Sequence, residues 1–217
     1  MSFSVELREA AAPVWERHVA HPFVAGIGDG TLPEDRFRFY VRQDYLFLID
    51  YGRLLALAAA RAPRLAWMRR FSGLAQSVLE TEMDLHRAYA ERWGISTEEL
   101  ESERTAPATD AYCDFLLRTA SLGDFTELVA ALLPCMWSYA EIGERLAAEG
   151  LPEHEGYAEW IAMYASAEYG QLAAWCRELT DAAAAEVAGP GHRRMHVAFR
   201  ASSEHELAFW DSAWQSG

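Results

Sequence analysis

The stretch EDRFRFYVRQDYLFLIDYGRLLALAAAR, residues 34–61, decides the fold class of this chain. Its apolar residues recur with the period of an α-helix, which indicates one long helix. One stripe along that helix, at spacing i, i+4, i+7 and i+11, is formed by Tyr40, Asp44, Phe47 and Tyr51. Because this stripe is mostly aromatic, we expect it to face the interior of a helical protein.

Helical periodicity dominates the rest of the chain as well, and no segment is a convincing strand. Glycine and proline separate the periodic stretches, most clearly in HPFVAGIGDGTLP (21–33), which we expect to be a turn-rich connector. Asp124, followed three residues later by Glu127, has the pattern of a capping box that starts a helix. We expect helices at about residues 2–19, 34–61, 64–93, 107–121, 124–149, 154–167, 168–187 and 191–214.

Length and composition predict one all-α domain over residues 1–217, a helical bundle with long helices. Of the 217 residues 51% are hydrophobic, and the chain has neither an internal repeat nor a low-complexity linker. Its apolar runs are far shorter than the roughly 18 residues that suggest a membrane span. Residues 1–20 also lack the apolar region of a signal peptide. We therefore expect a soluble cytoplasmic protein.

The charged residues of the chain argue against anionic partners and against sites that depend on lysine. The net charge is −14, and the isoelectric point is about 4.9. An acidic surface argues against nucleic acid and anionic membranes as partners, since both favour basic patches. All 19 basic residues are arginine, which excludes a Schiff-base or P-loop lysine. The three cysteines are too few and too scattered for a disulfide framework or a zinc cluster.

Cys135 follows Pro134 inside LVAALLPCMWSYAEIG (128–143), which otherwise reads as a buried helix. Pro134 has no N–H for the carbonyl of Ala130, so we expect it to bend the helix beside the thiol. Tyr139 lies one turn further along the same face. The pattern fits a buried structural cysteine, which is the commoner case, and it also fits a nucleophile in a pocket.

Two acids and two further tyrosines also lie on helix faces that are predicted to point inward. Asp44 belongs to the aromatic stripe, and Glu206 shares a face with the aromatic residues of the last helix. Such an acid is either a core group satisfied by a hydrogen bond or a site residue. Tyr112 and Tyr164, taken singly, are typical of packing. The whole set, with the thiol, describes a pocket for a flat heterocycle between facing helices.

A metal or haem protein of the same architecture is the first alternative. Glu82 and His86 are spaced i, i+4 and could ligate iron, and His18 and His21 lie near the end of the first helix. A di-iron site, however, needs more inward carboxylates and a second histidine. We expect Glu82 and His86 to form a solvated pair, and we expect neither a metal nor a cofactor.

The motifs taken together resemble those of the TenA family. They are HPFVAGIGDGTLPEDRF followed by YVRQD, then ALLPC with Trp137 and Tyr139, and the late E-x-x-F-W of residues 206–210. The similarity covers nearly the whole chain. It implies an all-α fold of the haem oxygenase type (TenA/PqqC) and assembly as a homotetramer. It also implies the activity of a thiaminase II, or aminopyrimidine aminohydrolase, which produces 4-amino-5-hydroxymethyl-2-methylpyrimidine from the aminomethyl compound or from thiamin.

The resemblance further implies roles for single residues. Cys135 matches the family nucleophile, and Glu206 matches an acid/base residue at the pyrimidine. Asp44 matches the aspartate that holds a ring nitrogen and the amino group. The positions of substrate-binding tyrosines are matched by Tyr112, Tyr139 and Tyr164. Two positions depart from the family pattern: the stacking residue, often tyrosine, is Phe47, and the residue after the cysteine, often aromatic, is Met136.

A non-catalytic protein that keeps the pyrimidine pocket is the second alternative, because a fold does not fix a function. Every matched site residue is present, which argues against degeneration, and the chain has no basic patch for DNA. The substrate stays open at this point. Thiamin, the aminomethylpyrimidine and its formylated relative share the ring and differ in the leaving group.

Overall fold

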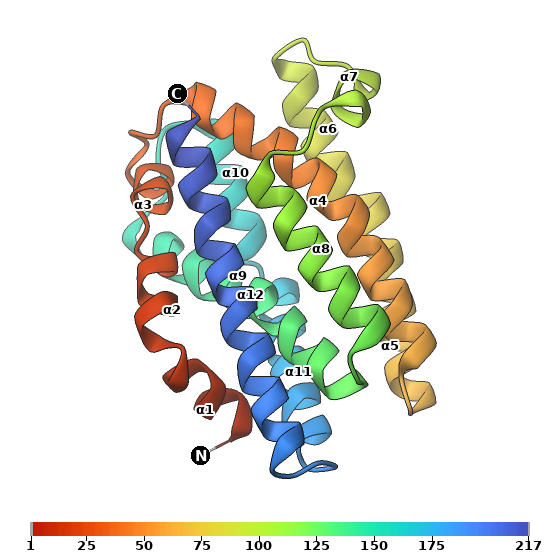
Figure 1. Ribbon diagram of the computed structural model, residues 1–217. Coiled ribbons are helices and arrows are strands. Elements are labelled where there is room, and N and C mark those ends of the chain that lie inside the picture. The colour runs from red at the N-terminus through yellow and green to blue at the C-terminus, as the bar shows by residue number, and fades with distance from the viewer. Residues whose placement is uncertain (1, 217) are drawn as a thin grey trace.

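A computed structural model of the protein describes residues 2–216, and within this range the regular elements are helices and no strand is present (Figure 1). The elements are α1 (Phe3–Ala10), α2 (Ala12–Val19), α3 (Pro22–Asp29), α4 (Glu34–Arg61), α5 (Leu65–Ser77), η1 (Val78–Glu82), α6 (Met83–Arg92), α7 (Thr97–Ser102), α8 (Pro107–Leu122), α9 (Phe125–Glu149), α10 (Glu155–Tyr164), α11 (Ala167–Ala184) and α12 (Pro190–Gln215). The element η1 is a stretch of π-helix between α5 and α6. The predicted all-α class is confirmed.

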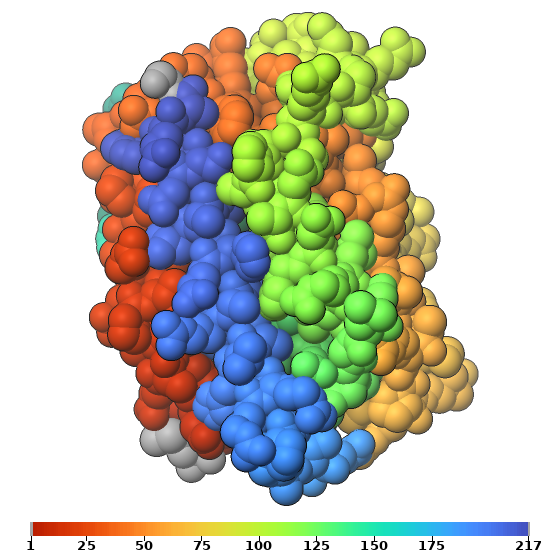
Figure 2. Space-filling model, viewed as in Figure 1, coloured from red at the N-terminus to blue at the C-terminus, as the bar shows by residue number. Residues whose placement is uncertain are grey.

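The helix α9 lies at the centre of the bundle. It packs against α8, α11 and α12 and also contacts α2, α3, α4 and α10. In Figure 1, α4, α8 and α12 lie side by side in front of it. The space-filling view shows the outer surface of α12 between α1–α3 on one side and α8 on the other (Figure 2). One continuous apolar core joins these helices, so a side chain that points inward from α9 reaches the middle of the molecule.

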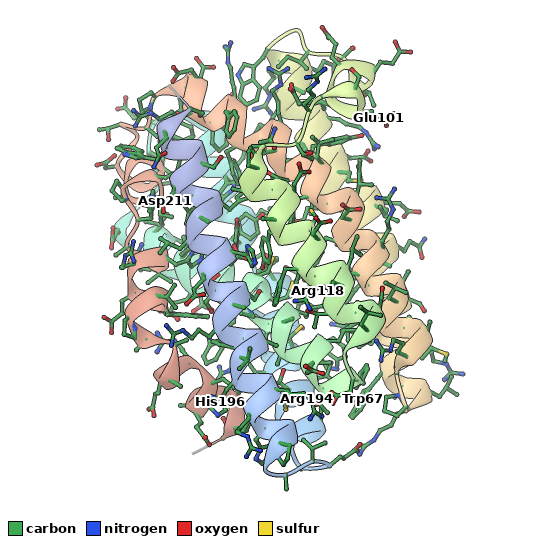
Figure 3. The ribbon with its side chains drawn as sticks, in the orientation of Figure 1. Trp67, Glu101, Arg118, Arg194, His196 and Asp211 are labelled. Carbon is green, nitrogen blue, oxygen red and sulfur yellow. The ribbon has the colours of Figure 1, made fainter. Side chains whose placement is uncertain are left out.

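The start of α9 is fixed by the residues that the sequence indicated. The Asp124 side chain accepts hydrogen bonds from the backbone N–H groups of Thr126 and Glu127, and the Glu127 carboxylate accepts one from the Asp124 N–H. Arg194 on α12 pairs with Asp124 and ties the two helices together (Figure 3). From there α9 continues through Pro134 without interruption. The bend expected at Pro134 stays a prediction.

The segment 21–33 is mostly helical, so the expectation of a turn-rich connector was wrong for most of it. His21 caps α3, because its Nδ1 accepts a hydrogen bond of 3.1 Å from the backbone N–H of Phe23. Pro22 takes the first helical position, where a missing N–H is tolerated. The helix ends at Gly30, whose φ of 77° lies in the left-handed region. Proline and glycine therefore bound a short helix here.

Two long helices expected from the sequence are divided in the structure. The first breaks at Ala11, between α1 and α2, and the third contains the π-helical stretch Val78–Glu82. The helix α7 was not predicted, although it begins with a capping box of Ser96 and Glu99. The π-helical stretch matters for the site, because such insertions shift the faces of the residues around them and are frequent at functional sites.

Gly143 allows α9 to approach the end of α10 closely. A Cβ atom at this position would lie 2.5 Å from the carbonyl carbon of Tyr164 and 2.7 Å from the backbone nitrogen of Ala165. Backbone atoms cannot move aside as a flexible side chain can. We therefore expect Gly143→Ala to lower the free energy of unfolding by about 1–3 kcal/mol, measured by urea denaturation.

The matched control for this substitution is Gly73→Ala on α5, where nothing lies within 4 Å of the added Cβ. The control is expected to be as stable as the parent chain or slightly more stable, because alanine is the better helix former. Equal stability of Gly143→Ala and the parent would contradict the close approach.

Candidate active site

A cavity of about 490 Å³ lies inside the bundle, which is within the range of about 300–1,000 Å³ typical of small-molecule sites. Its walls come from α4, α5, η1, α8, α9, α10, α11 and α12. All seven residues predicted for the site belong to its lining: Asp44, Phe47, Tyr112, Cys135, Tyr139, Tyr164 and Glu206. The fold therefore brings together side chains that are far apart in the sequence.

Cys135 projects from the central helix into this cavity, near the Glu206 carboxyl. Burial raises the pKa of the Cys135 thiol well above its ordinary value, and the negative charges of Glu206, Glu82 and Asp44 raise it further. Cys135 is therefore a neutral thiol at neutral pH. To act as a nucleophile it needs a proton acceptor at the moment of attack.

The Glu206 side chain lines the same cavity and is buried on the inward face of α12. The Tyr112 hydroxyl donates a hydrogen bond of 2.6 Å to Glu206 Oε1 and lies 3.0 Å from the Ser202 hydroxyl. Burial raises the pKa of Glu206 to about 8, with a further contribution from the charge of Asp44, although the Tyr112 hydrogen bond opposes the shift. Glu206 is consequently a carboxylic acid at neutral pH, able to donate a proton.

Asp44 has a basic hydrogen-bond partner, His86, whereas the Glu206 carboxyl is hydrogen-bonded by a tyrosine hydroxyl. The Nδ1 of His86 donates to the backbone carbonyl of Glu82 over 2.9 Å, and its Nε2 lies 2.7 Å from Asp44 Oδ2. Burial alone lowers the pKa of His86, but the hydrogen bond and charge of Asp44 outweigh burial and raise that pKa above its ordinary value. Below this pKa the two residues form a buried ion pair. The Tyr40 hydroxyl donates a hydrogen bond of 3.2 Å to the same oxygen.

The expectation of a solvated Glu82–His86 pair was wrong. His86 is only 2% exposed and faces Asp44, while Glu82 lines the cavity. The Tyr164 hydroxyl lies 3.4 Å from Glu82 Oε1 and donates to it. Burial, with the charge of Asp44, raises the pKa of Glu82 to about 7. The sequence interpretation assumed a regular helix over 64–93, and the π-helical stretch changes which face Glu82 occupies.

Aromatic side chains form the walls of the cavity. Phe47 packs against Tyr112 with ring centroids 5.0 Å apart, and Tyr139 packs against Tyr164 at 4.9 Å. The hydroxyl of Tyr51 is buried and has no hydrogen-bond partner within the described part of the chain. Tyr51 lines the cavity, so its hydroxyl is a polar group of the site residues without a partner in this part of the chain. Its place on the aromatic stripe was the signal that could have marked it as a site residue.

Both departures from the family pattern, Phe47 and Met136, line the same cavity. Neither brings a polar atom to it. Across residues 2–216, no group of three or more histidine, cysteine, aspartate or glutamate side chains is arranged to hold a metal ion. Within the same range, no helix is both long enough and apolar enough to cross a membrane.

A helical bundle that encloses a thiol and several carboxyl groups between aromatic walls has the make-up of an enzyme for a small flat substrate. Sequence comparison identifies the family to which this enzyme-like bundle belongs. The sequence pattern of the TENA/THI-4/PQQC family matches residues 8–216, and the chain belongs to that family.

Comparison with individual proteins, in sequence and in structure, supports this family assignment. The aminopyrimidine aminohydrolase of Halalkalibacterium halodurans is 46% identical over 217 residues, which cover 99% of this chain and 96% of that protein. The TenA homologue from P. horikoshii OT3 superposes with a TM-score of 0.91 at 32% identity, over 100% of both chains. A domain from Shewanella denitrificans with a heme oxygenase-like fold, 14% identical, has a TM-score of 0.74 over 97% of this chain and 91% of its own. The last likeness shows the fold alone, which is the predicted one.

Proposed function

We propose that this chain is an aminopyrimidine aminohydrolase of the thiaminase II type. It replaces the leaving group on the methylene of 4-amino-5-aminomethyl-2-methylpyrimidine, or of thiamin, by a hydroxyl group. The observation that carries the proposal is one cavity in which the Cys135 thiol adjoins the carboxylic acid of Glu206 between aromatic walls. The full-length similarity to a protein that bears this name supports the same activity.

Asp44 and the aromatic walls of the cavity bind the pyrimidine ring. The Asp44 carboxyl group, held by His86, accepts hydrogen bonds from the ring amino group. Phe47 stacks on the ring face, and Tyr139 lines the ring from α9. The hydroxyls of Tyr112 and Tyr164 lie at the two carboxyl groups that flank the reacting centre.

Cys135 supplies covalent catalysis. Direct displacement by water is slow, because an amine leaves poorly and water is a weak nucleophile. The Cys135 sulfur instead forms a bond to the ring carbon next to the substituted one, and the dearomatised ring expels the leaving group from the methylene. Water then adds to the exocyclic methylene, the C–S bond breaks, and the ring regains its aromaticity.

Glu206 moves the proton in this scheme. As a carboxylic acid it gives its proton to a ring nitrogen, and the resulting carboxylate accepts the proton of the Cys135 thiol. The net result is transfer of the thiol proton to the ring, with Glu206 restored. This relay activates a thiol of raised pKa in a chain that has no lysine. Acid–base catalysis of this kind contributes about 10²–10⁴-fold.

A substrate panel tests the proposed function. Purified protein is incubated separately with the aminomethylpyrimidine, its formylated relative and thiamin, and hydroxymethylpyrimidine is quantified by chromatography. Release of that product from at least one compound supports the hydrolase. Tight binding of hydroxymethylpyrimidine without turnover of any of the three would contradict it and favour a pyrimidine-binding protein.

His86 is expected to act through Asp44, as a positioning residue. His86→Gln keeps an amide N–H for Asp44 but removes the positive charge, so the ionised form of Asp44 loses its partner. We expect KM for the aminopyrimidine to rise about tenfold, the equivalent of one charge-assisted hydrogen bond, with kcat changed much less. Steady-state kinetics measure the split. The control is His196→Gln, which contacts Glu6 outside the cavity. A fall in kcat alone would argue against a role in recognition.

Assembly and location complete the proposal. We expect a homotetramer in the cytoplasm, as the family resemblance implies. Six large apolar side chains are exposed on the single chain and would be covered if they lay in contacts between subunits: Leu65, Met68, Leu79, Leu122, Leu151 and Val197. Light scattering of the purified protein measures the mass of the assembly.

A further inference from the structure

Glu82 places a further carboxyl group at the cavity wall, on a different element from Cys135 of α9 and Glu206 of α12. It is the last residue of the π-helical stretch, whose bounds are Val78–Glu82. The Tyr164 hydroxyl donates to its Oε1. Among the described residues none donates a hydrogen bond to its Oε2, although Glu82 belongs to the cavity lining. One carboxyl oxygen is therefore left for a ligand.

The charge balance of the cavity favours a cation at this oxygen. Four carboxyl groups line the cavity, those of Asp44, Glu82, Glu206 and the exposed Glu168. The only base that pairs with any of them among the described residues is His86, and it is committed to Asp44. Arg69 and Arg70 also border the cavity, but both are exposed on α5. A bound cation would let Glu82 ionise and would take the place of the missing partner.

We propose that Glu82 binds a positively charged leaving group, so that the chain selects aminopyrimidines carrying a primary ammonium on the methylene over those with a neutral amide. This inference rests on the proposed hydrolase function and names the substrate class of the same cavity. The carboxylate accepts an N–H hydrogen bond and keeps the amine protonated.

Protonation of the amine is what the bond cleavage requires. When the C–N bond breaks, its electron pair goes to nitrogen. An ammonium group therefore leaves as neutral ammonia, whereas an unprotonated amine would have to leave as an amide ion. A neutral formamide gains nothing from a carboxylate at this place. Glu82 thus acts on the leaving group, while Glu206 serves the ring and the thiol.

The test compares Glu82→Gln with the parent chain on the aminomethylpyrimidine and on its formylated relative. Glutamine keeps an oxygen for Tyr164, and in place of the second, charged oxygen it has a neutral N–H₂ group that cannot accept a hydrogen bond from an ammonium. We expect the ratio of kcat/KM for the amine to kcat/KM for the formamide to fall about 10–100-fold, the range of one charge-assisted hydrogen bond. The matched control is Glu80→Gln, an exposed residue of the same π-helical stretch that contacts Gln76. Equal losses on both substrates would overturn the proposal, because a merely structural role lowers both rates together.

A binding measurement separates this inference from the proposed function. In a Cys135→Ala background, calorimetry gives the affinities of the aminomethylpyrimidine and of the neutral hydroxymethylpyrimidine with and without Glu82→Gln. We expect the substitution to weaken binding of the ammonium compound about 10–100-fold more than binding of the neutral one. If the parent chain turns over no substrate but this selective loss is found, the hydrolase proposal fails and the role of Glu82 stands. An equal loss for both ligands overturns the role of Glu82, whatever the turnover.

Discussion

Cys135→Ala is expected to abolish hydrolysis, with kcat lower by about 10⁴-fold or more, the scale on which enzymes lose activity with their nucleophile. Without the sulfur no bond to the ring can form, and the ring electrons cannot expel the leaving group. Binding should survive, because Asp44 and the aromatic walls are untouched. The measurement is the rate of hydroxymethylpyrimidine formation, together with the dissociation constant of that product, which should stay within a few-fold of the parent value.

The matched control is Cys113→Ala, a buried cysteine on α8 that does not line the cavity. It is expected to keep the parent kcat. Cys135→Ser gives the sharpest comparison, because it replaces only the sulfur atom by oxygen. The serine hydroxyl is a much poorer nucleophile than the thiol, so turnover should be lost. Near-normal turnover by Cys135→Ser would refute the covalent route.

Glu206→Gln is the second large effect, a fall in kcat of about 10²–10⁴-fold. The amide keeps an oxygen for Tyr112 but can neither give a proton to the ring nor take the proton of the thiol. The parent enzyme should also show a pH limit set by this group. The pKa of Glu206 in the free protein is raised to about 8, so its acid form predominates below that pH and kcat/KM should decline as pH rises through it.

A pH profile of kcat/KM checks both parts of this prediction. The residual activity of Glu206→Gln should lack the decline near pH 8 that the parent shows. Glu204→Gln is the control, since Glu204 lies two residues earlier on α12 and is exposed to solvent. If Glu206→Gln kept the rate and the pH profile of the parent chain, a group other than Glu206 would have to transfer the proton from the thiol to the ring.

Much of the fold follows from local sequence patterns. The stretch 34–61 forms the single helix expected from its periodicity, and Asp124 starts α9 because its side chain satisfies backbone N–H groups of the first turn. The segment 21–33 was misjudged for a physical reason. Proline at a first helical position and glycine just after a last one are also boundary signals of a short helix, and His21 is an uncommon cap.

The site was predictable where side chains lie on regular helices. Cys135, Asp44 and Glu206 could be assigned to inward faces, because α9, α4 and α12 keep their register around these positions. Glu82 and His86 could not be assigned to a face, because their orientation depends on a π-helical stretch that no local sequence pattern predicted. The pairing of His86 with Asp44 joins two helices, so it became visible only in the folded chain.

One measurement tests the central claim most directly. Purified protein is given the aminomethylpyrimidine in water labelled with a heavy oxygen isotope, beside Cys135→Ala, and the product is analysed by mass spectrometry. The account predicts hydroxymethylpyrimidine with the label in its hydroxyl group from the parent chain, and no more than a trace from the variant. A parent chain that binds the pyrimidine and releases no labelled product would contradict the account, as would equal product formation by the variant.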